Sequence, residues 1–327
     1  MKKILYLAFS FILAVLSGCT HKYPDGEGTL TLEVGLTLNL QWESFENLTK
    51  AALRSAGGYS RRFIVEVRRE GRTVFRQTLV PGNFIERQTE FTLPEPLMLH
   101  ALEYTLAVWS DYAATGSADG LHYNTSALHS VAVNEPYTGN TDRRDCHYAV
   151  TTLDLRPYRD RWNAKVRIEA NMTRPLAKYR IIATDAGKFI ESAGKKFPGE
   201  KDFGIRFTYG FYFPVAFNVW EGKPSGSRLG VAFEGTLSLP DDGAEEVLLG
   251  SDYIFTSETG SYIPLVMEIF SLAGGNTIGR FPVLNVPYRR GYVTTLRGRF
   301  LSAFFDSGGI GIDPGFDGDI NINLDNL

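Results

Sequence analysis

Cysteine and histidine are both scarce in this sequence of 327 residues. The two cysteines lie at positions 19 and 146, and the residues before Cys19 give it a separate role, described below. Cys146 is then alone, so we expect no internal disulfide, and burial of apolar side chains must stabilise the fold. None of the 5 histidines has the His-Glu-x-x-His spacing of a zinc site. The sequence therefore predicts no metal and no cofactor.

Catalytic motifs are also missing. The chain has no Gly-x-Ser-x-Gly elbow, no glycine-rich phosphate loop and no Cys-x-x-Cys pair. Cys146 and His147 are neighbours, but adjacent side chains of a strand point to opposite faces, which suits a nucleophile and its base poorly. The run from Asp313 to Leu324 lacks two ligands of a calcium loop and is better interpreted as a turn and a strand. We expect no catalytic residue; a secreted hydrolase, the alternative, would need a cleft with convergent titratable groups.

Neither an excess of positive charge nor a membrane-length apolar run is present. The chain has 34 Lys and Arg against 37 Asp and Glu, interspersed with one another, which argues against nucleic acid as a partner. The longest uncharged apolar run, Ile4 to Leu16, is shorter than the ~20 residues that a helix needs to cross a bilayer. It follows Lys2 and Lys3, so residues 1–18 are typical of a signal peptide.

The end of this segment reads Leu16-Ser17-Gly18-Cys19 and resembles the lipobox of bacterial lipoproteins. The resemblance implies that the Cys19 thiol is acylated and becomes the mature N-terminus; a stray cysteine behind an ordinary signal peptide is the alternative. Residues 19–28 are polar and form a lipidated tether. We therefore expect a lipid-anchored protein of the outer membrane, exposed at the cell surface.

An alternation with a period of two begins directly after the tether. Threonine, Glu, Gly, Asn and Gln occupy the odd positions from 31 to 41, and apolar residues occupy the even ones. This pattern predicts a long, half-buried strand over residues 29–42. Its core-facing side chains are Leu30, Leu32, Val34, Leu36, Leu38 and Leu40.

Similar stretches recur along the chain, separated by Gly, Pro, Asn and Asp. Residues 63–80 predict a hairpin, and helix is expected only near residues 46–56 and 185–195, where a loop is the alternative. The apolar signal lapses over residues 156–161, where we place a domain boundary. The fold class predicted is all-β, with two antiparallel β-sandwich domains in tandem, residues 29–158 and 159–327.

Three stretches are similar to fimbrillin-like lipoproteins of the Bacteroidales. They are Val108-Trp109-Ser110-Asp111-Tyr112, Leu121-His122-Tyr123-Asn124-Thr125 and the run from Tyr137 to Asp145, and the ending from Gly309 to Ile322 resembles the same group. The resemblance implies transthyretin-like sandwiches and a fimbrial anchor or related pilus subunit, with other fimbrial subunits as partners. Cys146 and His147 depart from the pattern after residue 145.

In that family, polymerising subunits are cut after an arginine and lose their first strand, and a neighbour's C-terminal strand fills the groove; anchors keep their N-terminus. Carried over to this chain, the first strand is residues 29–42, treated as an edge strand, and the cut would follow Arg54. An ordinary solvated Arg54 and a tail that completes its own domain are the alternatives. The candidate donor side chains are Ile310, Ile312, Phe316, Ile320 and Ile322.

A glycan-binding surface lipoprotein is the main rival interpretation. It would share the signal, the β-sandwiches and the abundant aromatic residues, and surface glycans would then be partners. Exposure distinguishes the two functions, and the residues to compare are Trp109, Trp162 and Trp220.

Overall fold

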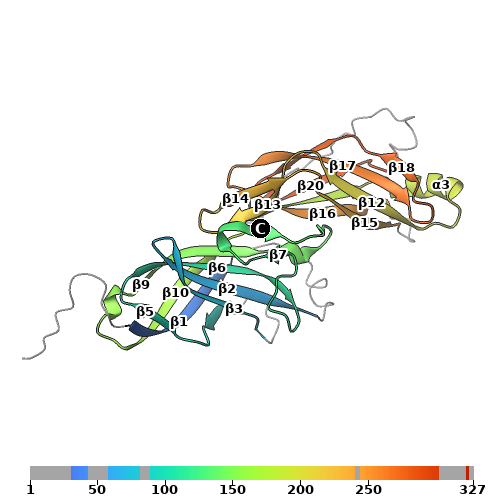
Figure 1. The fold of residues 1–327 in the computed structure, drawn as a ribbon. Coiled ribbons are helices and arrows are strands. Elements are labelled where there is room, and N and C mark those ends of the chain that lie inside the picture. The colour runs from blue at the N-terminus through green and yellow to red at the C-terminus, as the bar shows by residue number, and fades with distance from the viewer. Residues whose placement is uncertain (1–30, 43–57, 82–88, 240–243, 302–321, 324–327) are drawn as a thin grey trace, which may run out of the picture.

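The computed structural model describes residues 31–42, 58–81, 89–239, 244–301 and 322–323. Strands predominate among them, so the all-β class is confirmed. Figure 1 shows an elongated molecule with a group of strands at each end and a smaller group between. The other described elements are the helix α3 (Ala186–Lys196) and the 3-10 turns η1 (Leu128–Ser130), η2 (Asp142–Arg144) and η3 (Arg156–Tyr158).

Two facing sheets make up the first lobe. One has the order β10-β1-β4, with β5 also paired to β1, and the other has the order β3-β2-β6-β9. Their apolar faces enclose one buried cluster. The strands are β1 (Thr31–Trp42), β2 (Tyr59–Arg69), β3 (Arg72–Leu79), β4 (Glu90–Thr92), β5 (Leu97–His100), β6 (Glu103–Ala114), β9 (His147–Asp154) and β10 (Asn163–Met172).

The β2–β3 hairpin confirms the prediction for residues 63–80. Its tip, Glu70-Gly71, has positive φ at both residues, 50° and 76°. Such a turn matches the twist of the flanking strands, and the glycine adopts this conformation without a steric penalty.

The pairing of β1 corrects two expectations. β1 runs parallel to β10 from Glu33 to Trp42, so the sandwich is not purely antiparallel. A second parallel pair joins two strands of the other lobe. β1 is also an interior strand, because β5 and β4 pair with its opposite side. β10 lies within residues 159–327 but pairs and packs with the first lobe, while the domain division itself stays a prediction.

The second lobe is built from another pair of sheets and α3. Their orders are β16-β11-β20-β21 and β15-β12-β17-β18, with β19 also paired to β17. The strands are β11 (Leu176–Ala183), β12 (Asp202–Tyr209), β15 (Ala232–Ser238), β16 (Val247–Phe255), β17 (Ser261–Ser271), β18 (Thr277–Arg280), β19 (Leu284–Tyr288), β20 (Tyr292–Gly298) and β21 (Ile322–Asn323).

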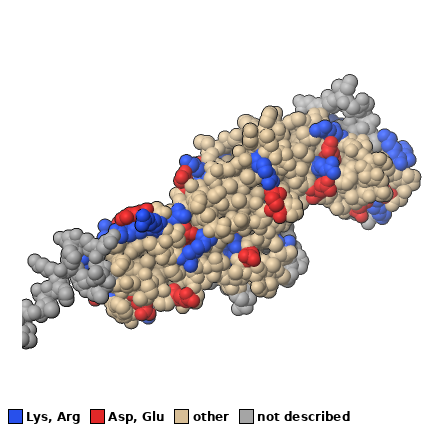
Figure 2. All heavy atoms as spheres, viewed as in Figure 1, with Lys and Arg blue, Asp and Glu red and all other residues tan. Residues whose placement is uncertain are grey.

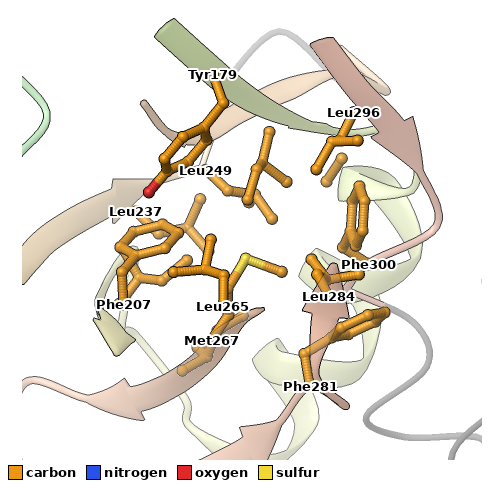
Figure 3. Close-up of a cluster of buried hydrophobic side chains, with 14 of the residues drawn as sticks. Tyr179, Phe207, Leu237, Leu249, Leu265, Met267, Phe281, Leu284, Leu296 and Phe300 are labelled. Carbon is orange, nitrogen blue, oxygen red and sulfur yellow. The ribbon is translucent and has the colours of Figure 1, made fainter. Parts of the chain in front are cut away.

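Side chains from both sheets meet in a core that is rich in aromatic rings. In Figure 3, side chains of β11, β16 and β20 converge on those of β12, β15 and β17. α3 adds Ala186, Phe189 and Ala193 to this core, one stripe of an amphipathic helix. The helix expected near residues 185–195 is therefore confirmed.

A fifth sheet contains strands from both halves of the chain. β7 (Tyr123–Asn124) and β8 (Val131–Val133) join β13 (Phe213–Asn218) and β14 (Lys223–Arg228) in the order β14-β13-β8-β7. This sheet and the outer face of β6 and β9 share a third buried cluster, which we call the junction core. The lobes are thus joined by packed side chains as well as by the chain.

The surface is mixed in charge. On the face in Figure 2, Lys and Arg lie beside Asp and Glu, and wide areas carry neither. Within the described residues, no helix has the length and apolar character needed to cross a membrane.

Candidate strand-exchange site and lobe junction

β1 lies between β10 on one side and β4 and β5 on the other, a position that we call the slot of β1. It places five aliphatic side chains in the core of the first lobe. Leu32, Val34, Leu36, Leu38 and Leu40 are each at most 3% exposed, and all belong to the core of that lobe. The predicted core-facing residues are therefore the buried ones wherever the structure describes them. Burying such a side chain contributes about 1.5–3 kcal/mol, so β1 contributes strongly to the stability of this lobe.

Backbone hydrogen bonds hold β1 along both edges. Glu33 N donates to Trp162 O at 3.0 Å beside β10. On the other edge, Leu40 N donates to Thr89 O at 2.7 Å, and Leu36 O accepts a hydrogen bond from Leu93 N at 2.9 Å. Without β1, both flanking strands would expose unpaired backbone groups next to an apolar floor.

Trp42 closes the end of the slot and connects it to the junction. Its ring centroid lies 4.9 Å from that of His147 and 6.2 Å from that of Phe63. The guanidinium of the buried Arg61 lies 5.5 Å from the Trp42 ring and 4.2 Å from the Tyr112 ring. The last residue of β1 therefore contacts the Trp-x-Asp-Tyr stretch through one arginine.

Asp111 of that stretch forms a buried ion pair with Arg62. Two hydrogen bonds of 2.6 and 2.7 Å join the side chains, and Arg62 also donates to Thr125 Oγ1 at 3.1 Å. Burial raises the pKa of the Asp111 carboxyl, and the hydrogen bonds from Arg62 act in the opposite direction. Trp109, from the same stretch, packs edge-on against Tyr123 with centroids 5.7 Å apart. The first two family-like stretches thus meet in the junction core.

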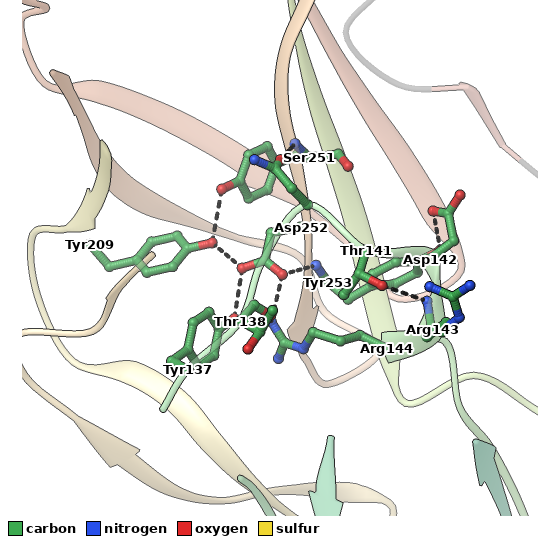
Figure 4. Close-up of polar contacts among 12 residues, drawn as sticks. Tyr137, Thr138, Thr141, Asp142, Arg143, Arg144, Tyr209, Ser251, Asp252 and Tyr253 are labelled. Atoms are coloured by element: carbon green, nitrogen blue, oxygen red, sulfur yellow. Dashed lines mark hydrogen bonds and ion pairs between the residues drawn. The ribbon is translucent and has the colours of Figure 1, made fainter. Parts of the chain in front are cut away.

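The third stretch reaches into the second lobe. Asp252 of β16 accepts hydrogen bonds from Tyr137 Oη at 2.6 Å and Arg144 Nη1 at 2.5 Å. A third bond comes from Tyr209 Oη at 2.6 Å, and Figure 4 shows the carboxylate surrounded by these donors. Arg144 and Asp252 are 2% exposed or less, and although burial opposes charge, Asp252 holds the pKa of Arg144 well above its usual range. This network fastens the junction to the second lobe.

Asp145 completes the polar connections. Its carboxylate accepts two hydrogen bonds from Arg174, at 2.8 and 3.1 Å, and its carbonyl lies 3.4 Å from Arg61 Nη1. The next residue, Cys146, is fully buried in the junction core, and burial raises the pKa of its thiol well above the usual range. His147 instead contacts Trp42. The side chains of Cys146 and His147 therefore lie in different surroundings, as strand geometry predicts.

The histidines of the polar loop differ in their surroundings. His122 is half-buried, and burial together with Arg144 and Arg143 lowers its pKa to about 4. His129 is exposed. The part of the chain that the structure describes contains no cluster of three or more His, Cys, Asp or Glu that could hold a metal.

Several predicted site residues fall outside the described residues. These are Cys19, Leu30, Arg54, Ile310, Ile312, Phe316 and Ile320. Ile322 is described, and its backbone pairs antiparallel with Val293 of β20. Lipidation, cleavage and strand donation therefore stay predictions.

Sequence reasoning missed the partners of the family-like stretches. Arg62, Arg174 and Asp252 lie outside those stretches, and the pairs that they form join positions 29 to 108 residues apart. For Arg62 and Asp252 the available signal was a charged residue within a strand, whereas Arg174 lies between β10 and β11. The three tryptophans singled out for the glycan-binding alternative differ in solvent exposure. Trp109 is buried, Trp220 is half-buried and Trp162 is 56% exposed.

Comparison with known proteins gives one family and several distant structural likenesses. Residues 26–326 match the model of a family described as a family of unknown function (DUF6562). No curated protein matches the chain. Among solved structures, the chain is similar to the fimbrial anchor protein Mfa2 from Porphyromonas gingivalis, with 11% identity and a TM-score of 0.39, over 81% of this chain and 91% of that one.

Two further solved structures are similar at the same level. A fimbrial assembly protein from Parabacteroides distasonis has 12% identity and a TM-score of 0.39, over 82% of this chain and 91% of that one. A candidate cell adhesion protein from Bacteroides eggerthii has 12% identity and a TM-score of 0.45, over 91% of this chain and 96% of that one.

Proposed function

This chain belongs to the family of unknown function DUF6562, and we propose that it is an outer-membrane lipoprotein that anchors or assembles a fimbrium through β-strand complementation. Cys19 carries the lipid, and the lobes stand outside the membrane. Several acyl chains on one cysteine, as in other lipobox proteins, give stable anchoring where a single chain would be marginal. The protein performs no catalysis in this role.

The buried strand β1 supports this proposal most directly. Its five aliphatic side chains and its pairing on both edges are what a strand needs if it is to be exchanged between chains. In an anchor, β1 stays in its slot and remains joined to the lipid through residues 20–30. If the chain is instead cut after Arg54, it becomes a polymerising subunit, and the same slot receives a neighbour's strand.

The C-terminal tail is the proposed contact with the neighbouring subunit. Its described part pairs with β20 at only two positions, Tyr292 with Asn323 and Val293 with Ile322. We infer that this part of the tail can leave β20 and pair with a strand of the neighbouring chain. Ile310, Ile312, Phe316, Ile320 and Ile322 would fill the neighbour's groove.

A pair of tail variants tests the donation. Tagged chains carrying Ile322→Asp or Asn323→Asp are expressed in the native cells, fimbriae are sheared off and sedimented, and the tagged protein in the pellet is measured. Adjacent strand residues point to opposite faces. We expect Ile322→Asp to reduce co-sedimentation at least tenfold, because a carboxylate would enter an apolar groove, and Asn323→Asp to leave it unchanged.

Both variants should remain folded, with a free energy of unfolding within about 1 kcal/mol of the parent chain. Equal co-sedimentation of Ile322→Asp and the parent chain would contradict donation by this tail. Equal loss in both variants would show that the effect does not depend on a groove-facing side chain.

A further inference from the structure

A cavity of about 330 Å³ opens beside the lobe junction, and we propose that it binds a neutral saccharide unit. Its lining includes Tyr148, Val150, Asn171, Thr173, Trp220 and Glu221. The proposal adds a second binding activity and does not depend on fimbrial assembly. The volume lies at the lower end of the range of small-molecule pockets, which are often found between domains.

The cavity walls come from segments far apart in the sequence and are fixed in place. Tyr148 of β9 and Thr173, which follows β10, exchange two backbone hydrogen bonds of 2.9 Å. The opposite wall is the turn between β13 and β14, residues 219–222. Arg290 holds the two walls together, because its Nη2 donates to Gly222 O at 2.6 Å and to Tyr148 Oη at 3.0 Å.

Gly222 is needed for this close approach. Its φ of 64° lies in the left-handed region, and a Cβ at this position would lie 2.9 Å from Tyr148 Oη. A larger residue would therefore push the turn away from β9. The shape of the cavity is thus determined before any ligand enters, which lowers the cost of binding.

The lining combines aromatic rings with hydrogen-bonding groups that suit hydroxyls. Sugar rings present C–H faces that stack on aromatic side chains and hydroxyls that both donate and accept. Asn171 offers an amide that donates and accepts, Thr173 a hydroxyl, and Glu221 a carboxylate that accepts. Trp220 supplies the ring, held by Arg68, whose guanidinium lies 4.3 Å from the indole centroid on one face.

The charges of the lining favour a neutral ligand. None of the described residues that line the cavity is a lysine or an arginine, so the lining offers no cation to pair with an anion. The Glu221 charge is itself balanced by Lys223 Nζ at 2.6 Å, which leaves little to attract a free cation. A neutral hexose or N-acetylhexosamine at the end of a glycan chain is the class that fits.

The four tryptophans allow a direct test on the mature chain. Indole N–H resonances are recorded by ¹⁵N–¹H correlation NMR, and the Trp220 peak is assigned with Trp220→Phe. D-galactose, D-mannose and N-acetyl-D-glucosamine are titrated separately, with choline and sialic acid as charged comparisons. We expect at least one neutral sugar to shift the Trp220 peak saturably and to leave the Trp162 peak in place.

Two matched valine variants decide whether the shift arises in the cavity. Val150→Trp fills it, whereas Val283→Trp places the same side chain on another exposed site, where Val283 is 57% exposed. The sugar-induced shift should disappear in Val150→Trp and persist in Val283→Trp. Asn171→Ala should weaken the apparent affinity about tenfold, through the loss of a hydrogen bond to the sugar.

The proposal is overturned if no neutral sugar shifts the Trp220 peak, or if the shift survives in Val150→Trp. It is also overturned if only choline or only sialic acid produces the shift. None of these outcomes bears on fimbrial anchoring, because the slot of β1 and the tail lie outside the cavity lining.

Discussion

At the residue scale, three buried arginine–aspartate pairs organise the lobe junction. They are Arg62–Asp111, Arg144–Asp252 and Arg174–Asp145, each with side chains no more than 4% exposed. Removing charges from water is costly, so such pairs add little net stability compared with apolar residues of similar shape. Each pair has well-defined geometry, however, and losing one partner leaves a buried charge. We infer that they set how the segments of the junction pair with one another.

Arg144→Met tests this role. Asp252 would keep its tyrosine donors but lose its cation, and we expect the free energy of unfolding to fall by about 3–5 kcal/mol. Denaturant unfolding measures the change. The double variant Arg144→Met, Asp252→Leu should recover part of the loss, since no charge remains buried although Tyr137 Oη loses its acceptor.

A matched control uses an exposed pair. Arg206 and Glu234 lie 2.6 Å apart on the surface, and Arg206→Met should cost less than about 1 kcal/mol. A loss of similar size for Arg206→Met and Arg144→Met would contradict the special role of the buried pair.

The pKa of His122 predicts a dependence of folding stability on pH. Its pKa is about 4 in the folded chain and 6.5 ordinarily, so between these values the unfolded chain binds the proton and the folded chain does not. Stability is therefore lost as the pH falls from 6.5 towards 4. For the half-buried side chain we expect about 1–2 kcal/mol of this loss between pH 6.5 and 4.5, absent in His122→Gln. Parallel slopes for the two proteins in unfolding curves against pH would refute it.

These residue roles were beyond sequence reasoning for a physical reason. The sequence identified Asp111 and Arg144 within family-like stretches, but a charged side chain does not reveal its partner when that partner lies 49 or 108 positions away. Cys146 was more tractable, because strand geometry alone separates it from His147.

At the element scale, local patterns predicted the elements themselves. The alternation over residues 31–42, the hairpin over 63–80 and the helix near 185–195 all depend on neighbouring residues, and all three are confirmed. The direction and partner of β1 depend on a strand more than 120 residues away. The alternation of Leu32 to Leu40 shows which face is buried but not whether the next strand runs parallel, so the interior position of β1 was missed.

Leu36→Ala measures how strongly β1 is held. Leu36 is fully buried, so the substitution removes apolar contacts and leaves a void, at a cost of about 2–5 kcal/mol. Thr37→Ala, on the opposite face of the same strand, should cost less than about 1 kcal/mol. Urea unfolding of both variants gives the comparison, and an equal small effect would show that the slot does not depend on its aliphatic floor.

At the scale of the whole molecule, the slot and the junction are physically connected. Trp42 ends β1 and lies beside Arg61, which in turn contacts Tyr112 and the carbonyl of Asp145. Loss of β1 would therefore uncover an arginine of the junction as well as the apolar floor of the first lobe. Retention of β1, as proposed for an anchor, keeps both regions intact.

The division of the chain into two domains depends on which strands pair across the whole molecule. A polar stretch at residues 156–161 was a reasonable boundary from composition, yet β10 follows it and completes the sheet of the first lobe. Strands from both halves also pair in the sheet β14-β13-β8-β7. Composition reports where the chain is exposed, and it does not report with which strands the following segment pairs.

The most direct test of the central claim is the N-terminus of the mature protein in its native membrane. Intact mass and N-terminal sequencing are performed on protein purified from the outer membrane, before and after exposure of the cells to an arginine-specific surface protease. The account predicts a lipid-modified Cys19 as the first residue in both samples, with β1 retained. An unmodified N-terminus, or a chain that begins at Ser55, would contradict the anchor function, and the latter would identify a polymerising subunit.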